Sequence, residues 1–354
     1  MTYALIMAGG IGSRFWPTSR KHKPKQFLNL IGKNTLIQQT VDRISPVIPL
    51  ERIFVSTNAD YTDLVREQLP DIPENNIIGE PIGRNTAPCI AFISRLIYQK
   101  EPDATLVVLP ADHYINDVDH YREIINAGIE KASGGNNLLT IGIKPSRPET
   151  GYGYIQYTSN GDEQVDDITI HPVKTFAEKP DLQTATWFLE SGDFLWNSGM
   201  FIWRVDTILT EFEKHLPEIF RESQNINKGS KSEIDTFYRN TVSISIDYGI
   251  MEKSTSVYVI PADFGWSDVG SWLSVYELRD KDEDGNVIDA EQVTLHDSQN
   301  CYVQVDDGRM VSLVGLQGIG VIDTKDALLV CRLDASQDVK QIYDSLKNGN
   351  KKYL

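Results

Sequence analysis

The 354-residue chain is poor in cysteine and has no cluster of cysteine and histidine residues. Its three cysteines, Cys89, Cys301 and Cys331, are widely spaced and form no CxxC pair or Cys/His cluster. A zinc site or a disulfide framework is therefore not expected. No apolar run approaches the ~20 residues of a membrane helix, and the apolar residues 1–8 follow no basic segment, which favours a first strand over a signal peptide. The expectation is a soluble, cytoplasmic protein without a membrane partner.

Basic residues are outnumbered by acidic ones, 34 to 50, which gives a formal net charge of -16. A nucleic-acid partner would normally require a basic face, so none is expected, and the acidity favours solubility. Acidic residues are in turn absent before Asp42, and that stretch contains Arg14, Arg20, Lys21, Lys23, Lys25 and Lys33. A basic segment in an acidic chain is consistent with two alternatives, a site for a polyanion such as a triphosphate or a solvated basic loop.

The first half of the chain alternates strand-like and helix-like segments. The expected strands are Tyr3–Met7, Ile53–Thr57, Thr105–Leu109 and Leu138–Ile143, and the expected helices are Leu36–Ile44, Tyr61–Leu69, Thr86–Tyr98 and Tyr121–Ala132. Buried strands that alternate with helices are typical of a sheet covered on both faces. The sequence predicts an α/β, Rossmann-like domain with a mixed, mainly parallel sheet, and ligands at the carboxyl ends of its strands.

The rest of the chain has a different pattern of expected strands and helices. Residues 144–265 mix short strands and helices, and we interpret them as an insertion that forms the acceptor side of a pocket. After residue 284, short β segments separated by turns predict a small β module, a short left-handed β-helix, before a helix at Val339–Leu346. The predicted domains are 1–283, catalytic, and 284–354, a β-rich module whose exposed edges suit a homodimer contact.

A glycine-rich turn, Ala8–Arg14, follows the first strand directly. Glycines let backbone N–H groups approach phosphate oxygens, although such a turn is also consistent with a simple tight turn. Phe15 stands where the dinucleotide fingerprint needs a third glycine and where the Walker pattern needs Gly-Lys, so neither common motif fits. Pro17 and Pro24 stiffen the cationic segment that follows, and such cations would neutralise a departing pyrophosphate.

Two separated aspartates are candidates for a metal site. Asp112 follows the buried strand Thr105–Leu109, and Asp268 lies among glycines and aromatics in Phe264–Trp272. Mg²⁺ prefers oxygen ligands and usually takes one or two carboxylates with phosphate oxygens. The alternative for each is a local capping role.

Polar segments suited to a sugar phosphate and a base occur elsewhere. Arg147–Tyr154, Phe176–Pro180 and Trp196–Phe201 combine carboxylate, amide and cation, as sugar-phosphate recognition requires. Glu80–Pro88 could read a base or could simply begin a helix, with Asn85 or Thr86 as its cap. Asp247 and Glu252 are interpreted as structural.

The run Ala8–Phe27 resembles the signature of nucleotidyltransferases that activate sugar phosphates. Its details at Phe15–Arg20 and Pro24–Phe27, with Gly83–Pro88 and Trp196–Phe201, resemble the bacterial mannose-1-phosphate guanylyltransferases. The resemblance implies transfer of GMP from GTP to α-D-mannose 1-phosphate, with Mg²⁺ as cofactor and with GDP-mannose and pyrophosphate as products. The nucleophile is already an anion, so no general base is needed and His113 is expected to be structural.

The resemblance also assigns site residues. The implied catalytic residues are Arg14, Lys25, Asp112 and Asp268, of which the two aspartates hold the metal and Lys25 bridges the donor and acceptor phosphates. The implied substrate-binding residues are Ala8, Gly9, Gly10, Gly12, Ser13, Arg20, Gly83, Arg84, Asn85, Thr86, Gly153, Glu178, Lys179 and Asn197. Among these, Arg20 would hold the terminal phosphates, Glu178 and Asn197 the sugar hydroxyls, and Lys179 the sugar phosphate.

Three alternatives stay open at this point. The first is the same chemistry with another sugar phosphate or nucleotide, which residue spacing cannot distinguish. The second is a catalytically silent nucleotide-binding subunit, against which Lys25, Asp112 and Asp268 are all present. The third is a bifunctional enzyme that also isomerises mannose 6-phosphate through a C-terminal metal site, against which residues 284–354 contain a single histidine, His296.

Overall fold

The computed structural model describes residues 1–306 and 308–354. The chain forms two compact units, which are treated separately below. Unit 1 comprises Met1–Gly9, Thr40–Ala111 and Ile115–Trp266, and unit 2 comprises Gly10–Gln39, Asp112–Tyr114 and Ser267–Leu354. The predicted division into domains 1–283 and 284–354 stays a prediction, because compactness alone does not show which segment folds independently.

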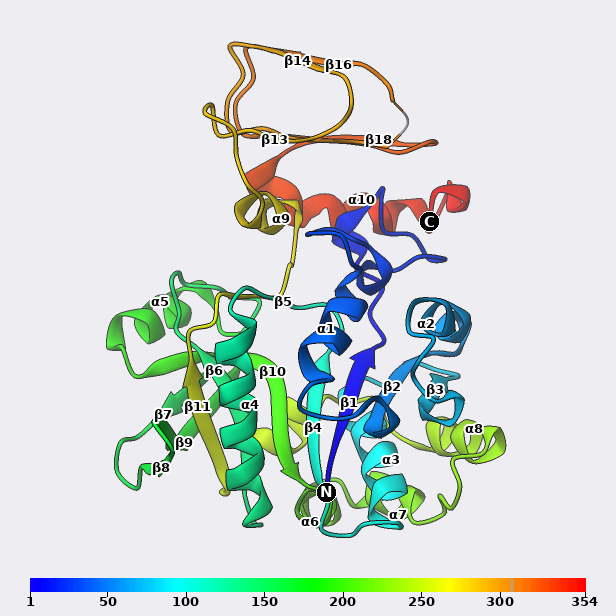
Figure 1. Ribbon diagram of the computed structural model, residues 1–354, viewed down its shortest axis with the longest axis vertical. Helices are drawn as coiled ribbons and strands as arrows, with labels where there is room; N and C mark the ends of the chain where they lie inside the picture. Colours follow the sequence, from blue (N-terminus) through cyan, green and yellow to red (C-terminus); the bar gives the residue numbers. More distant parts are fainter. Residues whose placement is uncertain (307) are drawn as a thin grey trace. The chain divides into compact units, whose positions relative to one another are not determined.

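Unit 1 is built on one large sheet with the strand order β3-β2-β1-β4-β10-β6-β11-β9-β7, and β8 pairs with β9 (Figure 1). The strands are β1 (Thr2–Ala8), β2 (Ile53–Asn58), β3 (Ile77–Glu80), β4 (Thr105–Pro110), β6 (Leu138–Ile143), β7 (Gly153–Tyr157), β8 (Glu163–Val165), β9 (Ile168–Glu178), β10 (Phe194–Arg204) and β11 (Val257–Ala262).

The sheet is mixed, as predicted. Pairing is parallel along β3-β2-β1-β4 and between β6 and β11. β10 is antiparallel to β4, β6 and β7, and β9 is antiparallel to β11, β7 and β8. The antiparallel strands β7–β10 all come from the segment interpreted as an insertion, so that segment adds strands to the sheet.

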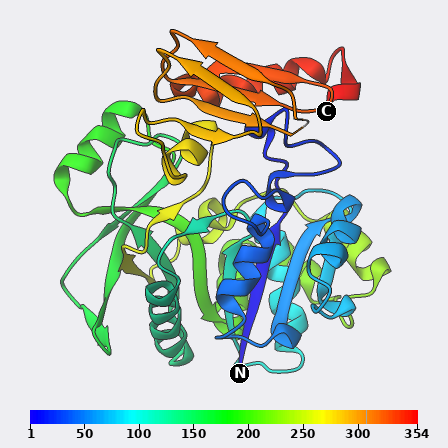
Figure 2. The ribbon, with the colours of Figure 1, turned by 45° about the horizontal axis from the view of Figure 1, so that its top comes forward.

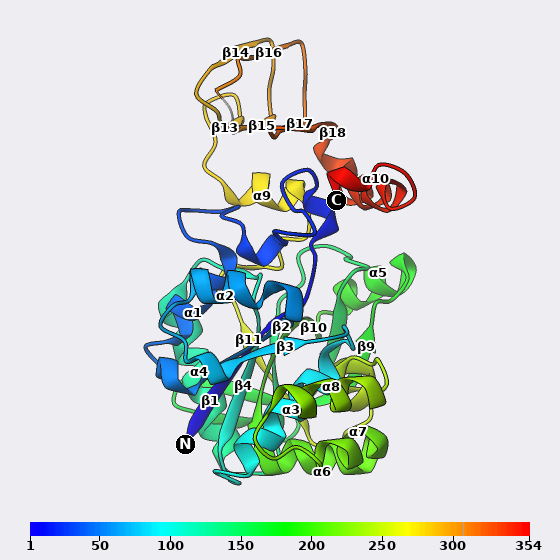
Figure 3. The same ribbon diagram turned by 90° about the vertical axis from the view of Figure 1, so that its right-hand side faces the viewer.

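Helices cover both faces of this sheet. They are α2 (Thr62–Gln68), α3 (Thr86–Tyr98), α4 (Val118–Ser133), α5 (Leu182–Ser191), α6 (Val205–His215), α7 (Pro217–Ser223) and α8 (Lys231–Asn240), with a π-helix at Asp247–Met251. Successive side chains of a strand point to opposite faces. Phe201 and Trp203 of β10 therefore join the apolar core formed with α3, α6, α7 and α8, while Ile202 lies against Gly128 of α4 on the other face (Figure 3).

The helix ends in unit 1 follow from local chemistry. The side chains of Asn85, Asp117 and Asp181 accept hydrogen bonds from the first turns of α3, α4 and α5, and Ser230 with Glu233 forms a capping box at α8. These side chains satisfy N–H groups that would otherwise have no partner inside the helix. The helix predicted at Thr86–Tyr98 begins and ends at these residues in the structure.

Unit 2 contains the cationic loop and the C-terminal module. Its elements are 3₁₀ turns at Ser13–Phe15, Lys25–Phe27, Leu333–Asp338 and Lys351–Tyr353, α9 (Trp272–Leu278), β13 (Val287–Asp289), β14 (Val293–His296), β15 (Tyr302–Val305), β16 (Val311–Val314), β17 (Ile319–Asp323), β18 (Leu328–Arg332) and α10 (Val339–Leu346). The segments α1 (Leu36–Ile44), β5 (Tyr114–Ile115) and β12 (Trp266–Ser267) contain residues of both units.

The C-terminal strands coil as predicted for a β-helix (Figure 2). β13, β15 and β17 pair in parallel in one sheet, while the intervening β14 and β16 pair in parallel in another. β18 runs antiparallel to β17 and ends the coil. Phe15 and Trp16 of the loop share one apolar core with Trp272 of α9 and with Val339 and Tyr343 of α10.

No helix within residues 1–306 and 308–354 is long and apolar enough to cross a membrane.

Candidate functional site

The glycine-rich turn is shaped by a close approach between two backbone segments. Gly12 has a φ of 69°, and a Cβ at this position would lie 2.2 Å from the Cβ of Lys25. The carbonyl of Ile11 accepts hydrogen bonds from the Ser19 hydroxyl at 2.7 Å and from the Lys25 amide at 3.3 Å. Only glycine therefore suits position 12, because it allows both the positive φ and the contact.

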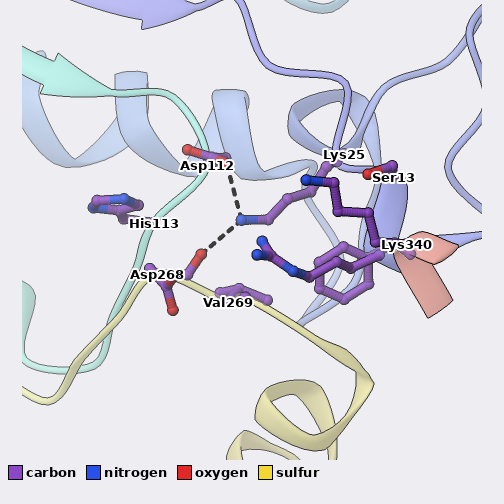
Figure 4. A pocket seen from close by; sticks show the side chains of 11 residues that line it. Ser13, Lys25, Asp112, His113, Asp268, Val269 and Lys340 are labelled. Carbon is purple, nitrogen blue, oxygen red and sulfur yellow. Dashed lines mark hydrogen bonds and ion pairs between the residues drawn. The ribbon is translucent and has the colours of Figure 1, made fainter. Parts of the chain in front are cut away.

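A cavity of about 280 Å³ lies beside this turn in unit 2. It is lined by residues from all three predicted catalytic segments and from α10: Gly12, Ser13, Arg14, Phe15, Lys25, Asp112, His113, Asp268, Val269, Gly270 and Lys340 (Figure 4). Lys25 lies at its centre, where Nζ donates hydrogen bonds to Asp112 Oδ2 at 2.9 Å and to the Asp268 carbonyl oxygen at 2.6 Å. The fold thus brings together Arg14, Lys25, Asp112 and Asp268.

Charge in this cavity is only partly balanced. The side chain of Lys25 is 6% exposed and that of Asp112 is 34% exposed, so their ion pair is partly shielded from water. Burial acts to raise the pKa of Asp112, but the positive charges of Lys25 and His113 outweigh it and hold this pKa below its ordinary value. Asp112 is therefore a carboxylate at neutral pH, which is the form that could bind a cation.

A second polar cluster lies in unit 1, where β7 pairs with β9. Gly153 is opposite Glu178 in this pairing, and a Cβ on Gly153 would lie 2.3 Å from Glu178 Oε2. The Glu178 side chain is 8% exposed, and its Oε1 is bonded to Lys179 Nζ. Among the described residues, Oε2 of Glu178 has no hydrogen-bond partner, which leaves a buried acceptor beside the glycine.

Asp247 belongs to the same cluster, although the sequence suggested a structural role. Asn197 Nδ2 donates to Asp247 Oδ1 at 2.8 Å, and the Thr140 hydroxyl donates to Asn197 Oδ1 at 3.1 Å. Burial and the charge of Glu178 raise the pKa of Asp247 to about 6. Asp247 opens a π-helix, a distortion that is frequent at functional sites. Apolar periodicity does not reveal such a distortion, and the interpretation of Asp247 as structural stays a prediction.

Comparison with known proteins decides the family. The family model described as nucleotidyl transferase matches residues 3–285. The chain belongs to the nucleotidyltransferase family. A second model, described as MannoseP isomerase/GMP-like beta-helix domain, matches residues 290–346 of this nucleotidyltransferase and agrees with the coil of β13–β17.

Similar proteins agree with this assignment. The mannose-1-phosphate guanylyltransferase of Klebsiella pneumoniae is 39% identical over 360 residues, covering 99% of this chain and 75% of the relative. Alginate biosynthesis protein AlgA of Pseudomonas fluorescens is 39% identical over 352 residues, covering 97% of this chain and 71% of the relative. The crystal structure of a mannose-1-phosphate geranyltransferase from Thermus thermophilus superposes with a TM-score of 0.87 and 33% identity. The match covers 98% of this chain and 99% of that one. The resemblance to the guanylyltransferases is confirmed.

Nucleotidyltransferases of this family generally use a divalent metal. Asp112 and Asp268 of this chain line one cavity and offer carboxylate oxygens, the donors that hard divalent ions prefer. Within residues 1–306 and 308–354 no group of three or more His, Cys, Asp or Glu side chains could hold a metal by itself. The residues present fit an ion that takes its remaining ligands from phosphate and water.

Arg20 has a structural environment that the sequence did not predict. It is not among the residues that line the cavity in the described part of the nucleotidyltransferase. Its side chain is 8% exposed, Nη2 lies 2.7 Å from Asp326 Oδ1, and Nη1 donates to the Tyr353 carbonyl at 3.0 Å. Arg20 therefore links the cationic loop to the C-terminal module, and its contact with the terminal phosphates stays a prediction.

The segment predicted to read the base forms the start of α3. Arg84 donates to the carbonyls of Tyr238 at 2.9 Å and Arg239 at 3.4 Å. Asn85 caps the helix with a φ of 66°, and the Thr86 hydroxyl accepts from the Ile246 amide at 2.8 Å. These bonds fix the segment, and base recognition by Gly83–Thr86 stays a prediction.

The remaining glycine-loop residues divide between the two units. The Ala8 carbonyl accepts a hydrogen bond from the Thr57 hydroxyl at 2.9 Å, which ties the end of β1 to β2. Gly9 and Gly10 have no atom of the described chain within 4 Å of an added Cβ. Their backbone is therefore open to a ligand, and its contact with nucleotide stays a prediction.

Proposed function

We propose that this nucleotidyltransferase transfers GMP from GTP to α-D-mannose 1-phosphate, giving GDP-mannose and pyrophosphate. The observation that carries the proposal is the unit 2 cavity, where Arg14 and Lys25 line the same space as the carboxylates of Asp112 and Asp268. Such an arrangement suits a triphosphate with a divalent ion. The names of similar proteins, at 39% identity, support mannose 1-phosphate as the acceptor.

In the proposed reaction an oxygen of the sugar phosphate attacks the α-phosphorus of GTP in line. The bond from the α-phosphorus to the bridging oxygen breaks, and pyrophosphate leaves with that electron pair. The nucleophile is an anion at neutral pH, so no side chain has to remove a proton and His113 needs no acid–base role. The contribution of the chain is then the positioning of two anions and the neutralisation of their charge.

Lys25 and Arg14 supply the cationic part of this neutralisation. Lys25 is held by Asp112 and by the Asp268 carbonyl, so its ammonium group is already directed into the cavity before substrate arrives. A fixed charge loses little free energy to reorganisation during the reaction. We propose Mg²⁺ as the metal, held by Asp112 and Asp268. When bound, it would stabilise negative charge on the phosphate oxygens.

The unit 1 cluster is proposed to bind the sugar phosphate. Oε2 of Glu178, which has no partner among the described residues, could accept a hydrogen bond from a sugar hydroxyl. The Asn197 amide could donate a hydrogen bond to another hydroxyl. Gly153 supports this role, because any side chain there would collide with Glu178 Oε2. Lys179 follows Glu178 directly and would neutralise the phosphate.

The test is a pyrophosphate-release assay that compares GTP, UTP, CTP and ATP against a panel of sugar 1-phosphates. We expect the highest kcat/KM with GTP and mannose 1-phosphate. Glu178→Gln, which changes charge at similar size, should raise the KM for the sugar phosphate more than the KM for GTP. Lack of turnover with this pair, together with turnover of another pair, would redirect the proposal to that sugar or nucleotide.

We further propose that the chain acts in the cytoplasm as a homodimer. The three cysteines are free thiols, as a reducing compartment requires. The edge strand β18 exposes Leu328 and Val330, at 53% and 58%, which suits contact with a second copy. Analytical ultracentrifugation should show a dimer that Val330→Glu converts to a monomer; a monomeric wild type would contradict this part.

A further inference from the structure

The cavity in unit 2 has one lining residue that no sequence motif indicated. Lys340 is the second residue of α10 in the C-terminal module, far in the sequence from the glycine-rich turn. Figure 4 shows its side chain extending from α10 into the cavity toward Ser13 and Lys25. The C-terminal module therefore contributes a cation to the space that contains the predicted catalytic residues.

Packing holds α10 in the position that directs Lys340 inward. Val339 and Tyr343, one turn apart on the helix, are each 3% exposed and belong to the apolar core that contains Phe15 and Trp16. The helix packs directly against the turn Ser13–Phe15. Lys340 follows Val339, so burial of its neighbour places it at the edge of that turn, where the cavity opens.

Lys25 is paired with the carboxylate of Asp112, whereas Lys340 has no such partner among the described residues. Within residues 1–306 and 308–354, the Lys340 side chain forms no hydrogen bond or ion pair. Asp344, one turn later on α10, is influenced by the charge of Lys340, but its carboxylate is bonded by Lys347 Nζ at 2.7 Å. Arg14 lines the same cavity. Cations gathered in one cavity repel each other, and a bound polyanion would relieve that repulsion.

We propose that Lys340 binds the β- and γ-phosphates of the nucleotide and the pyrophosphate that they become. This inference rests on the proposed function and extends it to the C-terminal module. Lys340 approaches from the side of Ser13, at the glycine-rich turn, whereas Asp112 and His113 lie beyond Lys25 (Figure 4). The terminal phosphates are the part of the nucleotide that backbone N–H groups of such a turn would cradle.

An ordinary solvated lysine is the competing explanation, and the same helix provides a control. Lys347 is exposed, is paired with Asp344, and does not line the cavity in the described chain. If Lys340 were only a solvated residue, replacing it should have the same small effect as replacing Lys347. If it binds phosphate, the two replacements should differ.

The module is also tied to the cationic loop at two further points. Trp16 Nε1 donates to the Tyr353 carbonyl at 2.9 Å, and Arg20 is paired with Asp326. These contacts keep α10 beside the loop, so the position of Lys340 is fixed by the fold. The module is thus part of the phosphate site as well as a scaffold.

The test is isothermal titration of inorganic pyrophosphate into wild type, Lys340→Gln, Lys340→Arg and Lys347→Gln, with thermal unfolding to check that each variant is folded. Removing one charge-assisted contact should weaken pyrophosphate binding on the order of ten-fold in Lys340→Gln. Lys340→Arg should retain most of the affinity and Lys347→Gln all of it. Equal affinity of Lys340→Gln and wild type would overturn the proposal.

Steady-state kinetics separates this proposal from the proposed function. Lys340→Gln should raise the KM for GTP on the order of ten-fold and leave the KM for mannose 1-phosphate unchanged. An equal rise in both KM values would contradict a role confined to the terminal phosphates. If wild type shows no turnover with GTP and mannose 1-phosphate but Lys340→Gln still loses pyrophosphate affinity, the proposed function fails and the role of Lys340 stands.

Discussion

Lys25 Nζ lies 2.9 Å from Asp112 Oδ2, although the two residues are 87 positions apart. One of the two carboxylates proposed to hold magnesium thus also directs the lysine proposed to neutralise the phosphates. The pair explains why Lys25 can be almost completely buried, since a buried ammonium group is costly without a charged partner. Substitution of Asp112 should therefore affect metal binding and lysine placement together, whereas a side-chain substitution at Asp268 keeps the backbone carbonyl that accepts from Lys25.

Asp112→Asn and Asp268→Asn test the proposed metal site. Each keeps the size of the side chain and removes its charge, so we expect kcat to fall at least about a hundred-fold and half-maximal activity to need more Mg²⁺. Asp263→Asn, at an exposed aspartate directly before that segment, should behave as wild type. Normal Mg²⁺-dependent activity of Asp268→Asn would show that the metal assignment is wrong.

Gly12→Ala tests the shape of the glycine-rich turn. The added Cβ would lie 2.2 Å from Lys25 Cβ at a residue with positive φ, so we expect the variant to lose about 1–3 kcal/mol of unfolding free energy and to bind GTP more weakly. Gly10→Ala is the matched control, because no atom of the described chain lies within 4 Å of its added Cβ. Equal stability of the two variants in urea unfolding would contradict this account.

Arg20 and Asp326 should be energetically coupled. Arg20→Ala removes the ion pair with Asp326 and one of the two hydrogen bonds that the Tyr353 carbonyl accepts, and we expect a loss of about 1–3 kcal/mol of unfolding free energy. Asp326→Ala should cost less, because its side chain is 50% exposed. In a double-mutant cycle measured by urea unfolding, the losses should be less than additive. Full additivity would show that the pair is not coupled.

The sequence predicted the features that depend on near neighbours and did not predict those that depend on residues far away in the chain. Apolar periodicity and turn residues predicted the strands and helices of the α/β half, because these features depend on near neighbours. The glycine-rich turn and Asp112 were candidates because each follows a recognisable strand, whereas Asp268 was a candidate because of the glycines and aromatics around it and the family resemblance. The sequence did not predict the contacts of Arg20 and Asp247 or the place of Lys340 in the cavity lining, because residues far away in the sequence make these environments.

Asp247 should make stability depend on pH. Its pKa of about 6 lies above the value of about 3.9 in an unfolded chain, so the folded protein binds a proton between these values that the unfolded chain does not. Stability should therefore fall as pH rises from 4 to 6. Asp247→Asn removes the cost of ionising this buried carboxyl. Its free energy of unfolding should therefore exceed that of wild type by on the order of 1–2 kcal/mol at pH 7 and should not exceed it at pH 4. Parallel unfolding profiles across this range would contradict the shifted pKa.

The central claim is GMP transfer to mannose 1-phosphate, and phosphorus NMR of the complete reaction tests it most directly. With GTP, mannose 1-phosphate and Mg²⁺, the spectrum should show GDP-mannose and pyrophosphate appearing in equal amounts while both substrates disappear. The same mixture with Asp112→Asn should remain almost unchanged over that time. Release of inorganic phosphate without a sugar nucleotide, or no reaction of the folded wild-type protein, would contradict the account.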